Sequence, residues 1–157
     1  MTYKVLVLGA CCAGKTSLYE ALRERFNVIE SDDAVLDRAG GIWPSTASEN
    51  RRVVVETAAE ALAMGEVIHI SSFVPTAMIR AARADGFTVA LLRVPLVELE
   101  RRNRERQRAG GHHDMSHWFA SQLESYAELD AEHLVDHILD GTEPLARIAA
   151  SVASLTA

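Results

Sequence analysis

One short stretch near the start of the chain restricts its possible folds more than any other. Residues 9–16 read Gly-Ala-Cys-Cys-Ala-Gly-Lys-Thr and fit the pattern G-x-x-x-x-G-K-[ST] at every fixed position. An apolar run of strand length, residues 3–8, precedes it, and Leu18, Leu22 and Phe26 recur at helical spacing after it. A strand, a glycine-containing loop and a helix in this order predict a phosphate-binding loop.

The residue types in this loop suit a nucleoside triphosphate. Gly9 and Gly14 permit backbone angles that a Cβ atom disfavours, so successive N–H groups can turn inward around a phosphate. The helix that follows adds its free amides and the positive end of its dipole. We expect Lys15 to reach the β- and γ-phosphates and the Thr16 hydroxyl to bind Mg²⁺. The predicted nucleotide-binding residues here are Gly9, Ala10, Cys11, Cys12, Ala13, Gly14, Lys15, Thr16 and Ser17.

The two cysteines of the chain, Cys11 and Cys12, stand side by side inside this loop. Adjacent cysteines give the fold no useful staple, which predicts a reducing, cytoplasmic location. Two interpretations of the pair stay open: small residues that fit the loop, or redox-sensitive thiols in an electropositive setting. We expect no membrane span, because no run approaches about 20 apolar residues, and no signal peptide, because a strand begins almost at once.

Length, composition and charge predict one domain that acts on small molecules. The 157 residues are 48% apolar and 24% charged, as in ordinary globular proteins, and we expect a single domain over residues 1–157. The net charge of −6 argues against duplex DNA as the main partner, because neutralising phosphates needs clustered Lys and Arg.

Strand-like and helical patterns alternate along the rest of the chain. Strands are expected at 27–30, 67–70, 87–94 and 133–139, with a helical turn at 34–38 and helices over 47–64, from 75, over 95–108, after 115 and from about 145. Ala81 and Leu145 are expected on inward faces. This alternation predicts an α/β fold, a three-layer α-β-α sandwich around a five-stranded parallel sheet.

The positions of the acidic residues and of a glycine hinge limit the classes of activity that the chain could have. The strands at 67–70 and 87–94 end without an acid, whereas Ser31-Asp32-Asp33 follows the strand at 27–30. A basic helix end runs into Gly110-Gly111, which predicts a mobile lid over approximately residues 107–117. A closing lid excludes water, and a kinase needs this in order not to hydrolyse ATP.

With these motifs the chain resembles the small P-loop kinases of the shikimate kinase and gluconate kinase type. Residues 30–33 and 37–40 are similar to the acidic motif and the following helix of shikimate kinases. Residues 102–106, Arg-Asn-Arg-Glu-Arg, are similar to the R-N-x-x-R lid-helix signature of polynucleotide 5′-kinases. The glycine triplet and the lid Arg-Pro of shikimate kinases are missing, so the resemblance does not extend to shikimate as the acceptor.

The resemblance implies that the protein moves the γ-phosphate of ATP, with Mg²⁺, to a hydroxyl of a small molecule. Asp32 would accept the hydroxyl proton or hold Mg²⁺ through water, and an N-cap of the next helix is its structural alternative. An arginine of the lid would close over the γ-phosphate. The candidates are Arg102, Arg106 and Arg108; Arg106 is favoured as catalytic together with Lys15 and Asp32, and Arg102 is placed with the nucleotide.

Further residues are expected around the acceptor. The predicted acceptor-binding residues are Asp32, Asp33, Trp43, Arg52 and Ser72, with Arg51 as an alternative to Arg52 and a core position as an alternative for Trp43. Arg101 and Arg104 are expected on a solvated face, in i,i+4 pairs with glutamates. Residues 140–142 resemble the adenine-side loop of these kinases.

Other interpretations stay open at this point. His112, His113, Asp114 and His117 have a spacing that zinc could use, although exposed lid residues are the simpler interpretation. A nucleoside, nucleotide or polynucleotide 5′-kinase acting on a short 5′-hydroxyl end is the alternative enzyme. A GTPase-like switch lacks the guanine motif N-K-x-D. A protein that binds nucleotide without chemistry is the remaining class.

Overall fold

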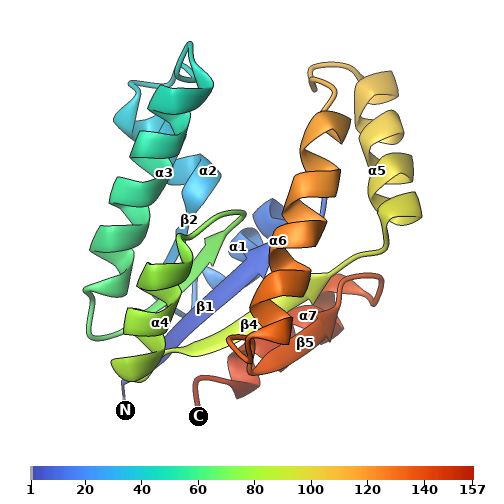
Figure 1. Ribbon diagram of the computed structural model, residues 1–157. Coiled ribbons are helices and arrows are strands. Elements are labelled where there is room, and N and C mark those ends of the chain that lie inside the picture. Colours follow the sequence, from blue (N-terminus) through green and yellow to red (C-terminus); the bar gives the residue numbers. More distant parts are fainter. Residues whose placement is uncertain (1) are drawn as a thin grey trace.

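Five parallel strands form one sheet at the centre of the computed structural model, which describes residues 2–157 (Figure 1). The strand order is β2-β3-β1-β4-β5, and all four strand pairs are parallel. The strands are β1 (Lys4–Gly9), β2 (Val28–Glu30), β3 (Val67–Ser71), β4 (Thr88–Arg93) and β5 (His137–Asp140).

Helices cover both faces of this sheet, which confirms the predicted three-layer α/β sandwich. Helices α3, α4 and α6 lie in front of the sheet in Figure 1, and α1 and α7 lie behind it. The helices are α1 (Lys15–Leu22), α2 (Ser31–Arg38), α3 (Ala47–Leu62), α4 (Thr76–Ala84), α5 (Leu96–Ala109), the 3₁₀ turn η1 (Ser116–Trp118), α6 (Phe119–Ala131) and α7 (Leu145–Ser154). Within residues 2–157, no helix combines the length and apolarity that crossing a membrane requires.

Strand β1 is buried along almost its whole length. Its residues Val5 to Leu8 are at most 1% exposed, as expected of an apolar strand that is covered on both faces. Because the strands are parallel, their carboxyl ends at Gly9, Glu30, Ser71 and Arg93 meet at one edge of the sheet. Ligands of open α/β sheets bind at this edge.

A second, smaller apolar cluster joins α2 and α3 to the end of β3. It consists of Val35, Val53 and Val54, with Phe73 packed against it. Arg38 on α2 also pairs with Glu56 and Glu60 on α3. The two helices are therefore held together as one unit beside the β3–α4 loop.

Some predicted boundaries differ from the structure. The strand expected over 133–139 begins only at His137, because α6 runs to Ala131 and the chain then reverses at His133, whose φ is +57°. The helical turn expected at 34–38 is instead α2, which starts at Ser31 because a side chain caps it. Ala81 and Leu145 are exposed, since the buried stripes of their helices run through Ile79 and Ala82, and through Ile148 and Val152.

Candidate active site

The loop between β1 and α1 has the geometry of an anion cradle. Gly14, the N-cap of α1, adopts a left-handed conformation with φ of +99°, which a side chain would strain. Ala13 N–H donates to Ala10 O at 3.0 Å and closes the turn. Lys15 is only 5% exposed, and its Nζ donates to Ala10 O at 2.8 Å. The lysine is thus folded back over the loop with its charge at the loop's own carbonyl.

The start of α1 supplies donors that the protein itself does not use. Within residues 2–157, no protein hydrogen bond satisfies the amides of Gly14, Lys15, Thr16 and Ser17. The hydroxyl-bearing residues Thr16 and Ser17 are exposed beside these amides. Free amides at a helix N-terminus carry partial positive charge and bind phosphate. The residues present therefore fit a triphosphate, with the Thr16 hydroxyl free to bind its Mg²⁺.

Glu30, and not Asp32, caps helix α2. The Glu30 carboxylate accepts the N–H groups of Asp32 and Asp33 at 3.1 and 2.9 Å, so the N-cap alternative for Asp32 was wrong. Glu30 is 2% exposed, and burial, followed by the charge of Asp32, raises its pKa. Asp32 is half-buried, and its carboxylate has no hydrogen-bond partner within residues 2–157, whereas Asp33 is exposed on the next position. The cap leaves the Asp32 carboxylate available for chemistry.

The charges of two predicted site residues, Lys15 and Asp32, act on the Cys11 thiol. Burial raises the pKa of the Cys11 thiol, the positive charge of Lys15 and a hydrogen bond from Gln122 lower it, and the negative charge of Asp32 raises it. The charges of the loop lysine and of the carboxylate after β2 therefore both act on this thiol. The net rise in pKa also gives no support to a reactive Cys11 thiolate.

Two arginines of α5 reach the phosphate-binding loop. Arg102 donates to Cys12 O at 3.2 Å and to Gly141 O at 2.8 Å, and its Nε pairs with Glu98 at 3.0 Å. Arg106 Nη1 lies 3.9 Å from Cys12 Sγ. Helix α5 therefore faces the loop with the two arginines that the sequence favoured, of which Arg102 is half-buried and Arg106 exposed.

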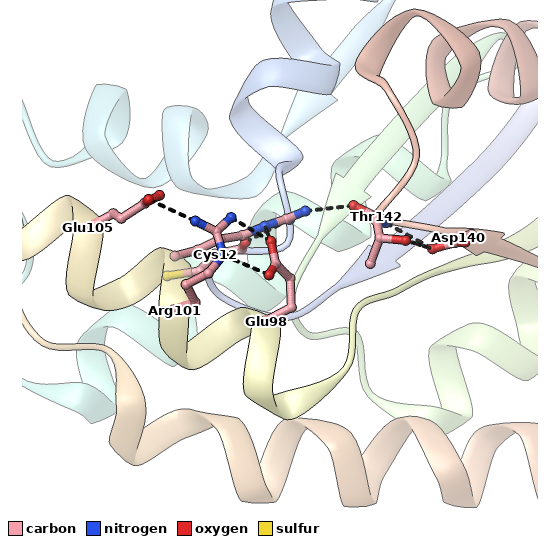
Figure 2. A network of polar contacts seen from close by, with 8 residues as sticks. Cys12, Glu98, Arg101, Glu105, Asp140 and Thr142 are labelled. Carbon is pink, nitrogen blue, oxygen red and sulfur yellow. Dashed lines mark hydrogen bonds and ion pairs between the residues drawn. The ribbon is translucent and has the colours of Figure 1, made fainter.

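The network in Figure 2 connects this loop to the end of β5. It shows Glu98 and Arg101 on α5 beside Cys12, and Asp140 and Thr142 at the β5–α7 turn. Asp140 Oδ1 accepts the Thr142 N–H at 2.9 Å, which fixes the turn that presents the Gly141 carbonyl. A Cβ atom on Gly141 would clash with the Val94 side chain, so only glycine fits there.

The remaining arginines of α5 point to solvent, as predicted for Arg101 and Arg104. Arg101 pairs with Glu98 and Glu105, each at 2.7 Å. Arg104 and Arg108 are exposed, and neither makes an ion pair within residues 2–157, so the i,i+4 pair expected of Arg104 was wrong. Among the described residues no hydrogen bond or ion pair ties Arg108 to the phosphate-binding loop, so of the three lid candidates it is the one that stands apart.

Helix α6 contributes two residues that the sequence did not single out. Gln122 Oε1 accepts the Cys11 N–H at 3.0 Å, and its Nε2 lies 3.4 Å from Cys11 Sγ. One turn later, Tyr126 OH donates to Ser72 O at 2.7 Å. The i,i+4 spacing of these polar groups on the inner face of the helix was the available signal. Together they pin the phosphate-binding loop and the β3–α4 loop to α6.

The predicted acceptor residues fall into two groups. Ser72 lies half-buried at the carboxyl edge, beside Phe73, over whose ring the Arg51 guanidinium stacks at 4.2 Å. Arg52 instead pairs with Glu56 at 2.7 Å on the outer face of α3. Trp43 is 49% exposed, so its core alternative was wrong. The geometry thus ties Arg51, more than Arg52, to the edge that carries the site.

The histidines between α5 and α6 do not form a metal site with their neighbours. Across the described residues 2–157, no three His, Cys, Asp or Glu side chains are grouped so that they could hold a metal ion. Asp114 is instead engaged by Asn103 and Ser116, and His112 and His113 are exposed.

A parallel sheet of order 2-3-1-4-5 with a glycine-rich phosphate loop after its central strand defines the fold of P-loop kinases. No protein-family model and no curated protein matches this chain. Several solved structures match it. A shikimate kinase from Acinetobacter baumannii in complex with shikimate matches with a TM-score of 0.74 and 16% identity, over 99% of this chain and 93% of that one.

Two further structures show the same likeness. A gluconokinase from Sinorhizobium meliloti 1021 matches with a TM-score of 0.65 and 23% identity, over 98% of this chain and 93% of that one. A sugar kinase from a Janibacter species has a TM-score of 0.66 and 18% identity, with coverages of 99% and 94%. At these identities the likeness establishes the fold: this chain has the fold of small P-loop kinases along nearly its whole length.

Proposed function

We propose that this protein is a small-molecule kinase that transfers the γ-phosphoryl group of ATP to an alcohol. The observation that carries this proposal is the phosphate-binding loop itself: its helix amides are unused, Lys15 Nζ lies over it at Ala10 O, and Arg106 Nη1 lies 3.9 Å from Cys12 Sγ. Phosphoryl transfer needs a cradle for the triphosphate, a cation over the transferred group and a base for the nucleophile. Each of these has a side chain or a set of amides at one edge of the sheet.

In this proposal the chain's own groups divide the work. The amides at the start of α1 hold the phosphates, and Lys15 moves from the Ala10 carbonyl to the β/γ-phosphate oxygens. The acceptor hydroxyl oxygen forms a bond to the γ-phosphorus, while the bond between the γ-phosphorus and the bridging oxygen of the β-phosphate breaks and releases ADP. Asp32 takes up the proton that this hydroxyl loses. Arg106 balances charge on the equatorial oxygens. Thr16, with Asp32 through water, would hold Mg²⁺, which shields the phosphate charge.

The acceptor would bind between the start of α2 and the β3–α4 loop. Asp32 lies at the start of α2 and Ser72 in the β3–α4 loop, and α6 contacts the neighbouring loops through Gln122, at the Cys11 N–H, and Tyr126, at the Ser72 carbonyl. Arg51 has no carboxylate partner within residues 2–157, which leaves its guanidinium free for an anionic group of the acceptor. A hydroxylated small molecule that also carries an acid group, such as a sugar acid, suits these side chains best.

The test is ADP release from Mg·ATP across a panel of acceptors. The panel contains sugars, sugar acids, shikimate-like acids, nucleosides, nucleotides, short 5′-hydroxyl oligonucleotides and aminoglycosides. We expect one class to raise ADP release well above the background hydrolysis, and Lys15→Met to abolish that rise. Tight ATP binding without stimulation by any acceptor would contradict the proposal and favour a nucleotide-binding protein without chemistry. Stimulation by oligonucleotides alone would favour a polynucleotide 5′-kinase.

A further inference from the structure

A buried amide stands in the middle of the lid helix. Most polar side chains of α5 reach solvent, but Asn103 is 4% exposed and lies one turn after the fully buried Leu99. A primary amide loses free energy on burial unless its donors and acceptors are paired. A leucine at this buried position of α5 would not carry the free-energy cost of burying an amide. The presence of asparagine there therefore needs an explanation in its contacts.

The Asn103 amide binds the chain where it returns from the lid. Its Oδ1 accepts the Met115 N–H at 3.0 Å, which fixes which end of the amide is oxygen. Its Nδ2 donates to Asp114 Oδ1 at 2.8 Å. The same Asp114 oxygen accepts the Ser116 N–H at 2.9 Å at the start of η1. One side chain thus joins α5 to the entrance of α6.

These contacts close residues 104–113 into a loop with both ends fixed. The loop contains the last turn of α5 with Arg106, the pair Gly110 and Gly111 with φ of +86° and +79°, and the exposed His112 and His113. Positive φ at two successive glycines lets the chain reverse direction there. Residues 104–113 therefore form a short segment that is anchored at both ends by the Asn103 contacts.

The same contacts contribute to setting the rotation of α5 about its axis, together with the buried Leu99 and the hydrogen bonds of Arg102. Arg102 and Arg106 are four residues apart and share a face, whereas Asn103 points about 100° away from Arg102 at 3.6 residues per turn. With the Asn103 side chain fixed against residues 114 and 115, the face with both arginines meets Cys12 O and Cys12 Sγ. Releasing the amide would let the last turns of α5 rotate or fray.

We propose that Asn103 is a positioning residue of the lid, which through Asp114 and Met115 holds Arg106 over the phosphate-binding loop. Asn103 touches no residue of the predicted nucleotide or acceptor site, so its effect on turnover is indirect. The kinetic consequence rests on the proposed kinase function, whereas the conformational consequence does not.

The test exchanges the two partners. In Asn103→Asp two carboxylates face each other, while Met115 keeps its acceptor. In the double variant Asn103→Asp/Asp114→Asn, the amide introduced at position 114 can donate to the carboxylate introduced at position 103. Its nitrogen then stands where Asp114 Oδ1 accepts the Ser116 N–H, so the Ser116 contact is given up. The contact between positions 103 and 114 is thereby restored with the direction of donation reversed. Asp114→Asn alone keeps an acceptor for Asn103 and serves as the matched control. Asp114→Ala removes the exposed partner and leaves the buried face of α5 intact.

Limited trypsin digestion reports on the lid without any need for catalysis. We expect cleavage after Arg106 or Arg108 to be about tenfold faster than in wild type in Asn103→Asp and in Asp114→Ala, and near wild type in Asp114→Asn. The double variant, which regains the contact between positions 103 and 114, should be cleaved severalfold more slowly than Asn103→Asp. Cleavage after Arg25, in the α1–β2 turn, is the internal reference. Far-UV circular dichroism checks folding; if Asn103→Asp fails to fold, Asp114→Ala decides.

Steady-state kinetics on the active acceptor give the second measurement. We expect kcat to fall roughly 10- to 100-fold in Asn103→Asp, because a small misplacement of a positioned group costs up to about 10²-fold. The KM for the acceptor should change little, and the double variant should turn over severalfold faster than Asn103→Asp.

A double variant as slow and as easily cleaved as Asn103→Asp would overturn the proposal, and so would unchanged cleavage after Arg106 and Arg108 in both Asn103→Asp and Asp114→Ala. An inactive wild-type protein would refute the kinase proposal, and the digestion would still decide on Asn103.

Discussion

Lowering the pH from 7 to 5 should destabilise this protein through one buried side chain, His69 on β3. The imidazole is 0% exposed, and its Nδ1 lies 3.0 Å from Ile29 O, one residue before the cap Glu30. A carbonyl only accepts, so Nδ1 carries the hydrogen of the neutral ring. Within residues 2–157 the buried Nε2 has no hydrogen-bond partner, so a proton there would place an unpaired charge in the core.

The size of the effect follows from the pKa of His69. Burial lowers this pKa from 6.5 to about 4, and the hydrogen bond to Ile29 offsets the shift only in part. Because the unfolded state takes up the proton first, the free energy of unfolding is unaffected well above pH 6.5 and falls as the pH drops from there toward 4. Between pH 7 and pH 5 the loss amounts to about 2 kcal/mol, and the limit below pH 4 is about 3 kcal/mol.

Urea denaturation of the wild type and of His69→Gln at pH 7 and pH 5 measures this loss. The Gln amide can still donate to Ile29 O but does not titrate, so the variant should lose about 2 kcal/mol less than the wild type over this range. Glu30, whose raised pKa acts in the opposite direction, is present in both proteins and cancels. Equal losses in the two proteins would refute the assignment of a neutral, buried His69.

Three further substitutions test the site. Asp32→Asn should lower kcat by about 10²–10⁴-fold with ATP binding nearly intact, and more than about a tenth of the wild-type rate would exclude a general base there. Arg106→Gln should cost roughly 10²-fold in kcat in the same assay, whereas the matched change Arg108→Gln should stay within about threefold; equal effects would contradict the contact with Cys12. Gln122→Leu leaves the Cys11 N–H without its acceptor and should lower the free energy of unfolding by about 1 kcal/mol in urea denaturation. The fold-loss in kcat caused by Asp32→Asn should be the same with and without Gln122→Leu.

The local elements could be predicted because each is set by nearby residues. The phosphate-binding loop follows from its two glycines and from the strand and helix that flank it, and β1 and β4 follow from apolar runs that only a doubly covered strand would bury. The end of α6 was harder to predict, because the chain reverses at His133 in a left-handed conformation, and histidine is not a residue that usually indicates such a turn. Strand β5 was therefore expected four residues too early.

The details of the site depended on contacts that are distant in sequence. The roles of Gln122 and Tyr126 arise only when α6 is laid over loops at Cys11 and Ser72, far earlier in the chain. Glu30 replaced Asp32 as the cap because a glutamate one residue before the helix can reach two amides, a geometry that the pattern Ser-Asp-Asp did not suggest. Asn103 was recognisable only as part of a signature, although its position four residues after Leu99 placed it on the buried face.

The most direct test of the proposed kinase is to detect the new bond itself. ³¹P NMR of wild-type protein with Mg·ATP and the stimulating acceptor should show a phosphomonoester resonance that grows in step with ADP, and the phosphorylated acceptor should be recovered by mass spectrometry. With Asp32→Asn at equal concentration this resonance should be lost while ATP remains bound. ADP appearing together with inorganic phosphate, and no phosphomonoester with any acceptor, would contradict the account and identify the protein as a nucleotide hydrolase.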